Sequence, residues 1–266
     1  MDWIQIVILA LIQGISEFLP VSSSAHLILP SELLGWSDQG LAFDVAVHIG
    51  SLGAVVTYFK QDIQRITLAW WSQITHQTHT SEAKLAWMIV IATLPAVVAG
   101  FMLADLVDVY FRNIGVIAAT TIGFGLLLGW ADHQPAQAQD ELKLTWQQAL
   151  LIGFAQALAL IPGTSRSGIT ITAALFLGLT RTSAARFSFL MSIPIILGAA
   201  SLMSIKLYQS NLTFDWYGML LGSGISFGSA WLCIHFFLKI INKMSMLPFV
   251  LYRLALGAFL CLFLIF

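Results

Sequence analysis

The chain has 266 residues, of which 58% are hydrophobic and only 9% are charged, and its mean hydropathy is +0.86. Soluble domains carry about 25% charged residues, so this composition excludes an ordinary soluble globule and predicts an integral membrane protein. The net charge of −1 gives no basic excess for a nucleic-acid partner. Cys233 and Cys261 lie in apolar runs and are expected to pack as small side chains, without a disulfide or a metal site.

Apolar stretches of about 17–25 residues are long enough to cross a bilayer as helices. Two further apolar stretches are interrupted: residues 3–34 by polar residues at 13–17 and 20–26, and residues 146–179 at 162–168. Irregular backbone at membrane depth is tolerated only where protein or a wet cavity surrounds it. We therefore predict two re-entrant helical hairpins, with a kinked span as the alternative for each. Six uninterrupted spans are predicted at 41–59, 85–104, 113–130, 184–204, 217–238 and 247–266.

This topology places both termini on one side of the membrane and the loops 60–84, 131–145, 180–183 and 239–246 on the other. Arg112 and Lys206 fall on the terminal side, whereas Arg186 and Arg253 lie just inside spans that start from the loop side. Positive residues mark the cytoplasmic face, so the termini are predicted on the outer side, which in a bacterium is the periplasmic side of the inner membrane. The loops carry Lys60, Arg65, Lys84, Lys143, Arg181, Lys239 and Lys243.

The two interrupted segments resemble each other. Aligning Pro20 with Pro162 places Ser23 on Ser165, and a glutamine, Gln13 or Gln156, precedes each loop. Three spans lie between the loops, and an odd number requires opposite orientations. The sequence therefore predicts a single membrane domain, 1–266, built from inverted repeats at about 1–130 and 146–266, whose sites lie near the bilayer midplane.

The first loop offers oxygen ligands and a nucleophile. Gln13 and Glu17 are four residues apart on one helix face and together suit Mg²⁺ or Ca²⁺. Serines at 22–24 precede His26, and a serine beside a histidine is a nucleophile with a base. A structural alternative is an ion pair between Glu17 and Arg166 that locks the two hairpins together.

The second loop, Pro-Gly-Thr-Ser-Arg-Ser-Gly at 162–168, opens an apolar helix. Backbone N–H groups at a helix start, hydroxyl donors and a forked guanidinium are what a phosphate group requires. Glycines would let the backbone approach such a ligand closely. The predicted phosphate-binding residues of this loop are Gly163, Thr164, Ser165, Arg166, Ser167 and Gly168.

The motif at 13–26 and the motif at 162–168 resemble the two signatures of the undecaprenyl-diphosphate phosphatase family of the bacitracin-resistance type. The first signature is [Glu/Gln]-x-x-x-Glu, filled here by Gln13 and Glu17, and many members have Glu at the first position. One negative charge fewer would weaken metal binding. The second signature is matched at every fixed position, and the resemblance covers the whole chain.

The resemblance implies a hydrolase that removes the terminal phosphate of undecaprenyl diphosphate and returns undecaprenyl phosphate to cell-wall (peptidoglycan) synthesis. It also implies a divalent cation and a pocket between re-entrant hairpins. Carried over by motif, Ser23 and His26 fall on the catalytic serine and histidine, and Arg166 on the essential arginine. Glu17 and Gln13 would handle the metal or position water, whereas the predicted substrate ligands are Ser22, Ser165, Ser167 and Thr170.

Three routes remain open from the residues alone: attack by Ser23 with His26 or Glu17 as base, attack by His26 itself, or attack by activated water. The alternative function is a lipid-phosphate transporter or flippase, since inverted repeats with midplane loops also describe carriers. The motifs of the type-2 phosphatidate phosphatases, a Lys-x6-Arg-Pro run and a Pro-Ser-Gly-His loop, are absent.

Two further features are expected to serve helix packing. Asp44 and His48 are four residues apart, and we interpret them as a hydrogen-bonded pair. Small residues at Gly218, Gly222, Gly224 and Gly228 allow close helix approach, inside the chain or, alternatively, in a homodimer.

Overall fold

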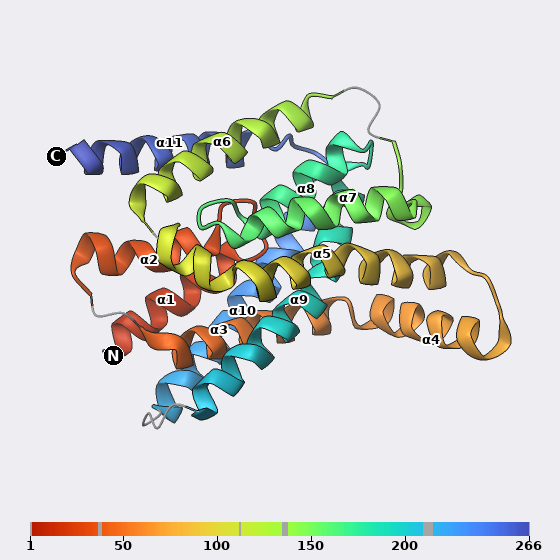
Figure 1. The fold of residues 1–266 in the computed structure, drawn as a ribbon, viewed down its shortest axis with the longest axis horizontal. Coiled ribbons are helices and arrows are strands. Elements are labelled where there is room, and N and C mark those ends of the chain that lie inside the picture. Colours follow the sequence, from red (N-terminus) through yellow and green to blue (C-terminus); the bar gives the residue numbers. More distant parts are fainter. Residues whose placement is uncertain (1, 37–38, 112, 135–137, 210–214, 266) are drawn as a thin grey trace.

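The computed structural model describes residues 2–36, 39–111, 113–134, 138–209 and 215–265, and over these ranges the chain is helical (Figure 1). An isolated bridge between Gln139 and Leu179 joins extended backbone. The α-helices are α1 (Trp3–Ser16), α2 (Ser23–Leu34), α3 (Gly40–Tyr58), α4 (Lys60–His76), α5 (Ser81–Tyr110), α6 (Ile114–Asp132), α7 (Trp146–Ala157), α8 (Arg166–Phe176), α9 (Arg181–Gln209), α10 (Trp216–Ile240) and α11 (Leu247–Ile265), with 3-10 turns η1 (Glu141–Lys143) and η2 (Leu158–Leu160).

Six of these helices are long and apolar enough to cross a membrane, namely α3, α5, α6, α9, α10 and α11. They coincide with the six predicted spans, so this part of the prediction is confirmed. The helices α5 and α9 run beyond the predicted limits of 85–104 and 184–204, because polar residues at their ends continue the helix.

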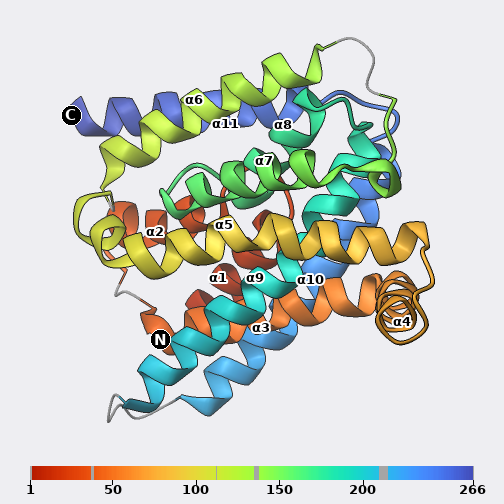
Figure 2. The same cartoon turned by 45° about the vertical axis from the view of Figure 1, so that its right-hand side comes forward.

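The region 60–84 was predicted as a loop, and that is wrong for most of it, because it contains α4. Charged and polar residues are interspersed among the apolar residues here, so α4 lacks the uninterrupted apolar stretch of a span. Trp70 packs edge-on against Trp87 of α5, with ring centroids 5.8 Å apart. Figure 2 shows α4 end-on while α5 is seen from the side, so the two helices cross.

Both chain ends lie on the same side of the bundle, at the left of Figures 1 and 2, as the predicted topology requires. The helix α4 and the start of α5 lie on the opposite side. Arg112 and the side chain of Lys206, which were assigned to the terminal side, lie outside the described residues.

Ion pairs tie the helix ends together on the side opposite the termini. Arg181 Nε lies 2.5 Å from the Asp132 carboxylate, which also accepts a hydrogen bond from the Met246 backbone N–H. Arg186 pairs with Glu141 at 2.7 Å and with Asp62 at 3.3 Å. These contacts connect α4, η1, α6 and α9. Arg181 and Arg186 therefore stabilise the packing of these helices, in addition to adding positive charge to this side of the protein.

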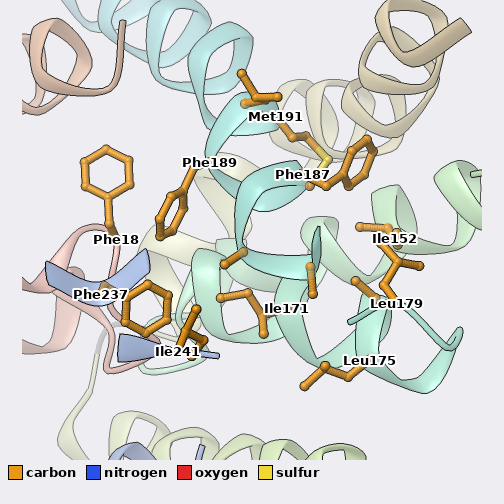
Figure 3. Close-up of a cluster of buried hydrophobic side chains, with 14 of the residues drawn as sticks. Phe18, Ile152, Ile171, Leu175, Leu179, Phe187, Phe189, Met191, Phe237 and Ile241 are labelled. Carbon is orange, nitrogen blue, oxygen red and sulfur yellow. The ribbon is translucent and has the colours of Figure 1, made fainter. Parts of the chain in front are cut away.

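A cluster of buried aromatic and aliphatic side chains fills the centre of the molecule (Figure 3). Phe189 of α9 packs edge-on against Phe18, with centroids 5.2 Å apart, and lies 5.8 Å from the ring of Phe237. Phe18 is fully buried and directly follows Glu17 in the chain. Burial of this ring therefore fixes where the turn between α1 and α2 places its polar residues.

Each interrupted segment folds as two short helices joined by a turn, α1 with α2 and α7 with α8. The residues before α2 and α8 are both serines with positive φ: Ser22 (φ 76°, ψ 93°) and Ser165 (φ 69°, ψ 113°). Matching these two backbones shifts the predicted alignment of Pro20 with Pro162 by one residue. One residue lies between Pro20 and Ser22, whereas two lie between Pro162 and Ser165. Ser22, not Ser23, is therefore the counterpart of Ser165. Ser23 then corresponds to Arg166, and Gln13 to Gln156.

Small residues allow α3 and α10 to touch. A Cβ added at Gly50 would lie 2.2 Å from the backbone oxygen of Ser223, and one at Gly222 would lie 2.6 Å from the ring of Phe43. Gly224 and Gly228 have nothing within 4 Å of such an atom. Of the predicted small residues, Gly222 therefore serves internal packing, whereas Gly224 and Gly228 face open space. The homodimer stays a prediction.

We expect Gly50→Ala to destabilise the protein by about 1–3 kcal/mol, because a backbone oxygen must move to make room for the new methyl group. The matched control is Gly224→Ala on the partner helix, which should change stability by less than about 0.5 kcal/mol. Thermal unfolding of both variants in detergent measures the difference. Equal melting temperatures would contradict the close contact at Gly50.

Candidate active site

Glu17 connects the two interrupted segments. It follows α1 directly and is only 8% exposed. Its Oε1 accepts a hydrogen bond from Arg166 Nη2 at 2.7 Å. Its Oε2 accepts bonds from Ser23 Oγ at 2.7 Å and from Gln13 Nε2 at 3.0 Å. One buried carboxylate therefore brings together four of the residues that the sequence singled out, from both halves of the chain.

Arg166 is the first residue of α8, and its side chain is 13% exposed. Besides its bond to Glu17, the guanidinium donates from Nη1 to the Ser188 carbonyl at 3.4 Å and lies 6.0 Å from the centre of the Phe18 ring. Among the described residues, two of its five N–H donors have an acceptor, which leaves three for a ligand. In the described part of the chain, the backbone N–H groups of Ser165 and Ser167 also have no acceptor. An anion at this point would meet charge and free N–H donors together.

Glu17, Ser165 and Arg166 line a cavity of about 540 Å³. Its polar residues include Glu17, Ser23, His48, Gln156 and Arg166. Residues 96–101 of α5 and 195–203 of α9 supply the long apolar wall, and their numbers increase toward the side of the chain ends. The lining of the cavity therefore suits an amphiphilic ligand. Most of its polar residues lie at the two turns, and its apolar wall extends along α5 and α9.

Five predicted phosphate ligands of the second segment do not line this cavity. Ser167 Oγ donates to the Leu19 carbonyl at 2.8 Å, which ties the second turn to the first. Thr170 Oγ1 binds the Arg166 carbonyl and the Ser188 hydroxyl. The hydrogen bonds of these two side chains stabilise the turns that line the cavity. A direct role in phosphate binding stays a prediction for all five residues. The five are Gly163, Thr164, Ser167, Gly168 and Thr170.

The chain matches the sequence model of the bacitracin resistance protein BacA over residues 6–259, which is nearly its whole length. It belongs to the BacA family. This is the family of undecaprenyl-diphosphate phosphatases, so the recognition from the two motifs is confirmed. Together with the six apolar helices, membership fits a multi-pass membrane protein.

In this BacA family member, His26 is separated from the other candidate residues. Its Nδ1 lies 2.6 Å from the Ser22 carbonyl, and because a carbonyl only accepts, Nδ1 carries the proton. Nε2 lies at hydrogen-bond distance from Tyr252 Oη, and the two rings stack with centroids 5.6 Å apart. His26 lines a second, apolar groove with Tyr252 and residues of α1. The structure thus brings Ser22, Ser23, Ser165 and Arg166 to the main cavity, but not His26.

His48 is the histidine that lines the main cavity in this BacA family member. Its Nε2 lies 3.9 Å from Glu17 Oε2, and its Nδ1 donates to the Asp44 backbone carbonyl at 2.7 Å. The predicted hydrogen bond between Asp44 and His48 is therefore present, but it is made to the backbone carbonyl of Asp44, while the Asp44 carboxylate accepts from Gln39. An ionisable residue in the middle of an apolar span is the signal that could have identified His48.

The cavity presents side-chain oxygen atoms of the kind that hard cations prefer. Of the predicted metal pair, Glu17 lines the cavity and Gln13 does not, so a metal site at that pair stays a prediction. The Gln13 amide turns its NH₂ group toward Glu17, and its buried oxygen has no partner in the described part of the chain. Gln156 is 2% exposed and lines the cavity. Its Nε2 donates to the Ala92 carbonyl, which leaves its buried oxygen without a partner there. Glu17 and Gln156 are thus the donors that suit Mg²⁺ or Ca²⁺.

Proposed function

We propose that this protein hydrolyses undecaprenyl diphosphate to undecaprenyl phosphate and inorganic phosphate, as a phosphoric anhydride hydrolase that recycles the cell-wall lipid carrier. The observation that carries the proposal is the cluster of Ser23, Glu17 and Arg166 at the polar end of an apolar cavity. A diphosphate would bind at the cluster, and the isoprenoid chain would lie along α5 and α9, where burial of apolar surface stabilises it. Release of the carrier from its diphosphate form accounts for bacitracin resistance.

Arg166 and the free N–H groups at the start of α8 would bind the terminal phosphate. Ser23 Oγ, held 2.7 Å from Glu17, attacks the phosphorus while the carboxylate takes its proton. The bond from this phosphorus to the bridging oxygen breaks, and undecaprenyl phosphate leaves. Water then attacks the phosphoserine, with His48 as base, or Glu17 once its proton has passed to the departing phosphate. The bond from phosphorus to Ser23 Oγ breaks, the hydroxyl regains a proton, and inorganic phosphate is released. A divalent cation held by Glu17 and Gln156 would neutralise charge on the departing phosphate oxygens.

Two features of the fold support an active site between the two turns that opens to the side of the chain ends. The turns between α1 and α2 and between α7 and α8 would form re-entrant hairpins of an inverted repeat, with their polar residues surrounded by protein. The cavity extends toward the side of the chain ends, and the basic loop residues lie at the other side. Since positive loops face the cytoplasm, the active site would open to the periplasmic side of the inner membrane.

The direct test is release of inorganic phosphate from undecaprenyl diphosphate by purified protein in detergent with Mg²⁺ or Ca²⁺. We expect release by the wild-type protein and none above background by Arg166→Ala. A transporter or flippase would release no phosphate in either form, while still moving a labelled lipid phosphate across vesicle membranes. That result would replace the proposed function.

The position of His26 predicts how its substitution affects this reaction. His26→Ala removes the shorter of the two hydrogen bonds to the Ser22 carbonyl and keeps the one from the backbone N–H of residue 26. It should lower kcat by about 10-fold or more, because the turn before Ser23 loosens. His26→Asn places an amide N–H near the position of Nδ1, so we expect it to retain several times the activity of the alanine variant. Steady-state assays compare the two. Equal loss in both would instead support His26 as base or nucleophile.

A further inference from the structure

Arg253 of α11 is fully buried, and its guanidinium faces peptide carbonyls only. A guanidinium has five N–H donors, and each of them here has one acceptor. Nε donates to Thr121 O at 3.0 Å, Nη1 to Thr164 O at 3.0 Å and Pro20 O at 3.3 Å, and Nη2 to Gly163 O at 2.9 Å and Thr120 O at 3.3 Å. The side chain is therefore completely satisfied without a carboxylate in the described part of the chain.

The five carbonyls come from three separate places: α6, the turn before α2 and the turn before α8. A buried charge without an ionic partner is costly unless the charged group itself makes enough hydrogen bonds, which are stronger than those between neutral groups. Arg253 thus joins both turns to α6 through one rigid planar group. This second connection uses other atoms than the Glu17–Arg166 pair, and Arg253 does not line the cavity.

Two glycines make room for this side chain. A Cβ added at Gly168 would lie 2.9 Å from Arg253 Nη1, and one at Gly125 of α6 would lie 3.1 Å from Arg253 Cβ. The glycine that ends the second motif therefore accommodates the guanidinium of Arg253. The sequence-based interpretation, close approach of the backbone to phosphate, is not needed to explain a glycine at 168.

The bonds to Arg253 set the direction of the peptide groups in the second turn. In a trans peptide the C=O and N–H groups point in opposite directions. Because the Thr164 carbonyl points at Arg253, the N–H of Ser165 points away from it, and Ser165 lines the cavity. We propose that Arg253 is a positioning residue, which orients the start of α8 and its N–H donors toward the diphosphate of the proposed reaction.

Arg253→Lys tests this proposal, because an ammonium group keeps the charge but has three donors in place of five and no planar fork. We expect kcat for phosphate release to fall by about 10–10²-fold, with KM changed less than about threefold. The matched control is Arg181→Lys, a partly buried arginine in an ion pair on the side of the bundle opposite the chain ends, with no bond to either turn. If Arg181→Lys lowers the melting temperature, we still expect the kcat of its folded fraction to equal that of the wild type.

A kcat of Arg253→Lys within about twofold of the wild type would overturn the proposal. The inference rests on the proposed function, so a measurement independent of activity separates the two. Amide hydrogen exchange over residues 19–25 and 162–168 should be faster in Arg253→Lys than in Arg181→Lys, even if no phosphate is released. Unchanged exchange at both turns would also overturn the positioning role, whatever the activity of the wild type.

Discussion

Arg166→Ala is expected to lower kcat/KM for phosphate release by about 10³-fold or more, which is the range measured when an arginine that stabilises a transferring phosphoryl group is removed. The guanidinium lies at the polar end of the cavity with three donors uncommitted, so charge that develops on the phosphate oxygens would be met by oriented N–H groups. Arg166→Lys should recover little of this, because lysine supplies a point charge without the bidentate fork.

The alanine variant also leaves the buried Glu17 carboxylate without its cation, so its stability must be measured together with its activity. The double variant Arg166→Ala, Glu17→Gln removes the unpaired charge and should recover the melting temperature but not the activity. If the double variant regained activity, the Glu17–Arg166 pair would be a structural lock between hairpins, and the proposed role in phosphate binding would be abandoned. Phosphate release and thermal unfolding on the same preparations decide between the two.

The sequence predicted correctly the parts of the fold in which the residues of a long segment are almost all apolar. Six helices were found at nearly their observed limits because each is an uninterrupted apolar run. The helix α4 was missed because polar and charged residues interrupt its hydrophobic residues, so it lacks a run of that kind. The alignment of the two turns was off by one residue, since backbone conformation at Ser22 and Ser165, rather than proline, defines their equivalence.

The candidate site was predicted where charge in an apolar segment is itself the signal, as for Glu17 and Arg166, which lie 2.7 Å apart although 149 positions separate them in the chain. The direction in which each side chain points could not be predicted from the sequence. His26 and His48 are both histidines in apolar helices, but hydrogen bonds with the backbone turn His48 toward the cavity and His26 toward Tyr252. Arg253 was counted as a charge near a loop, whereas it binds five carbonyls from distant segments. Such contacts exist only once the segments have assembled.

Ser23→Ala is expected to abolish a phosphorylated intermediate and to lower kcat by at least about 10³-fold, since the hydroxyl bonded to Glu17 is the attacking atom of the proposed reaction. Rapid quench of wild-type protein with substrate labelled in the terminal phosphate should give label on the protein within one turnover. The neighbouring hydroxyl provides a matched control, because Ser24 also lines the cavity but has no bond to Glu17. Ser24→Ala should therefore still accumulate label.

The outcome separates three routes that start from the same cavity. Label that persists in Ser23→Ala but disappears in His26→Ala would move the nucleophile to His26, although that ring faces a different groove in the structure. No label in the wild type, together with steady release of phosphate, would indicate direct attack by water, for which His48 and Glu17 are the bases within reach of the cavity. In that case Ser23→Ala should lose only the contribution of one hydrogen bond, about 10-fold, because the carboxylate and the guanidinium remain in place.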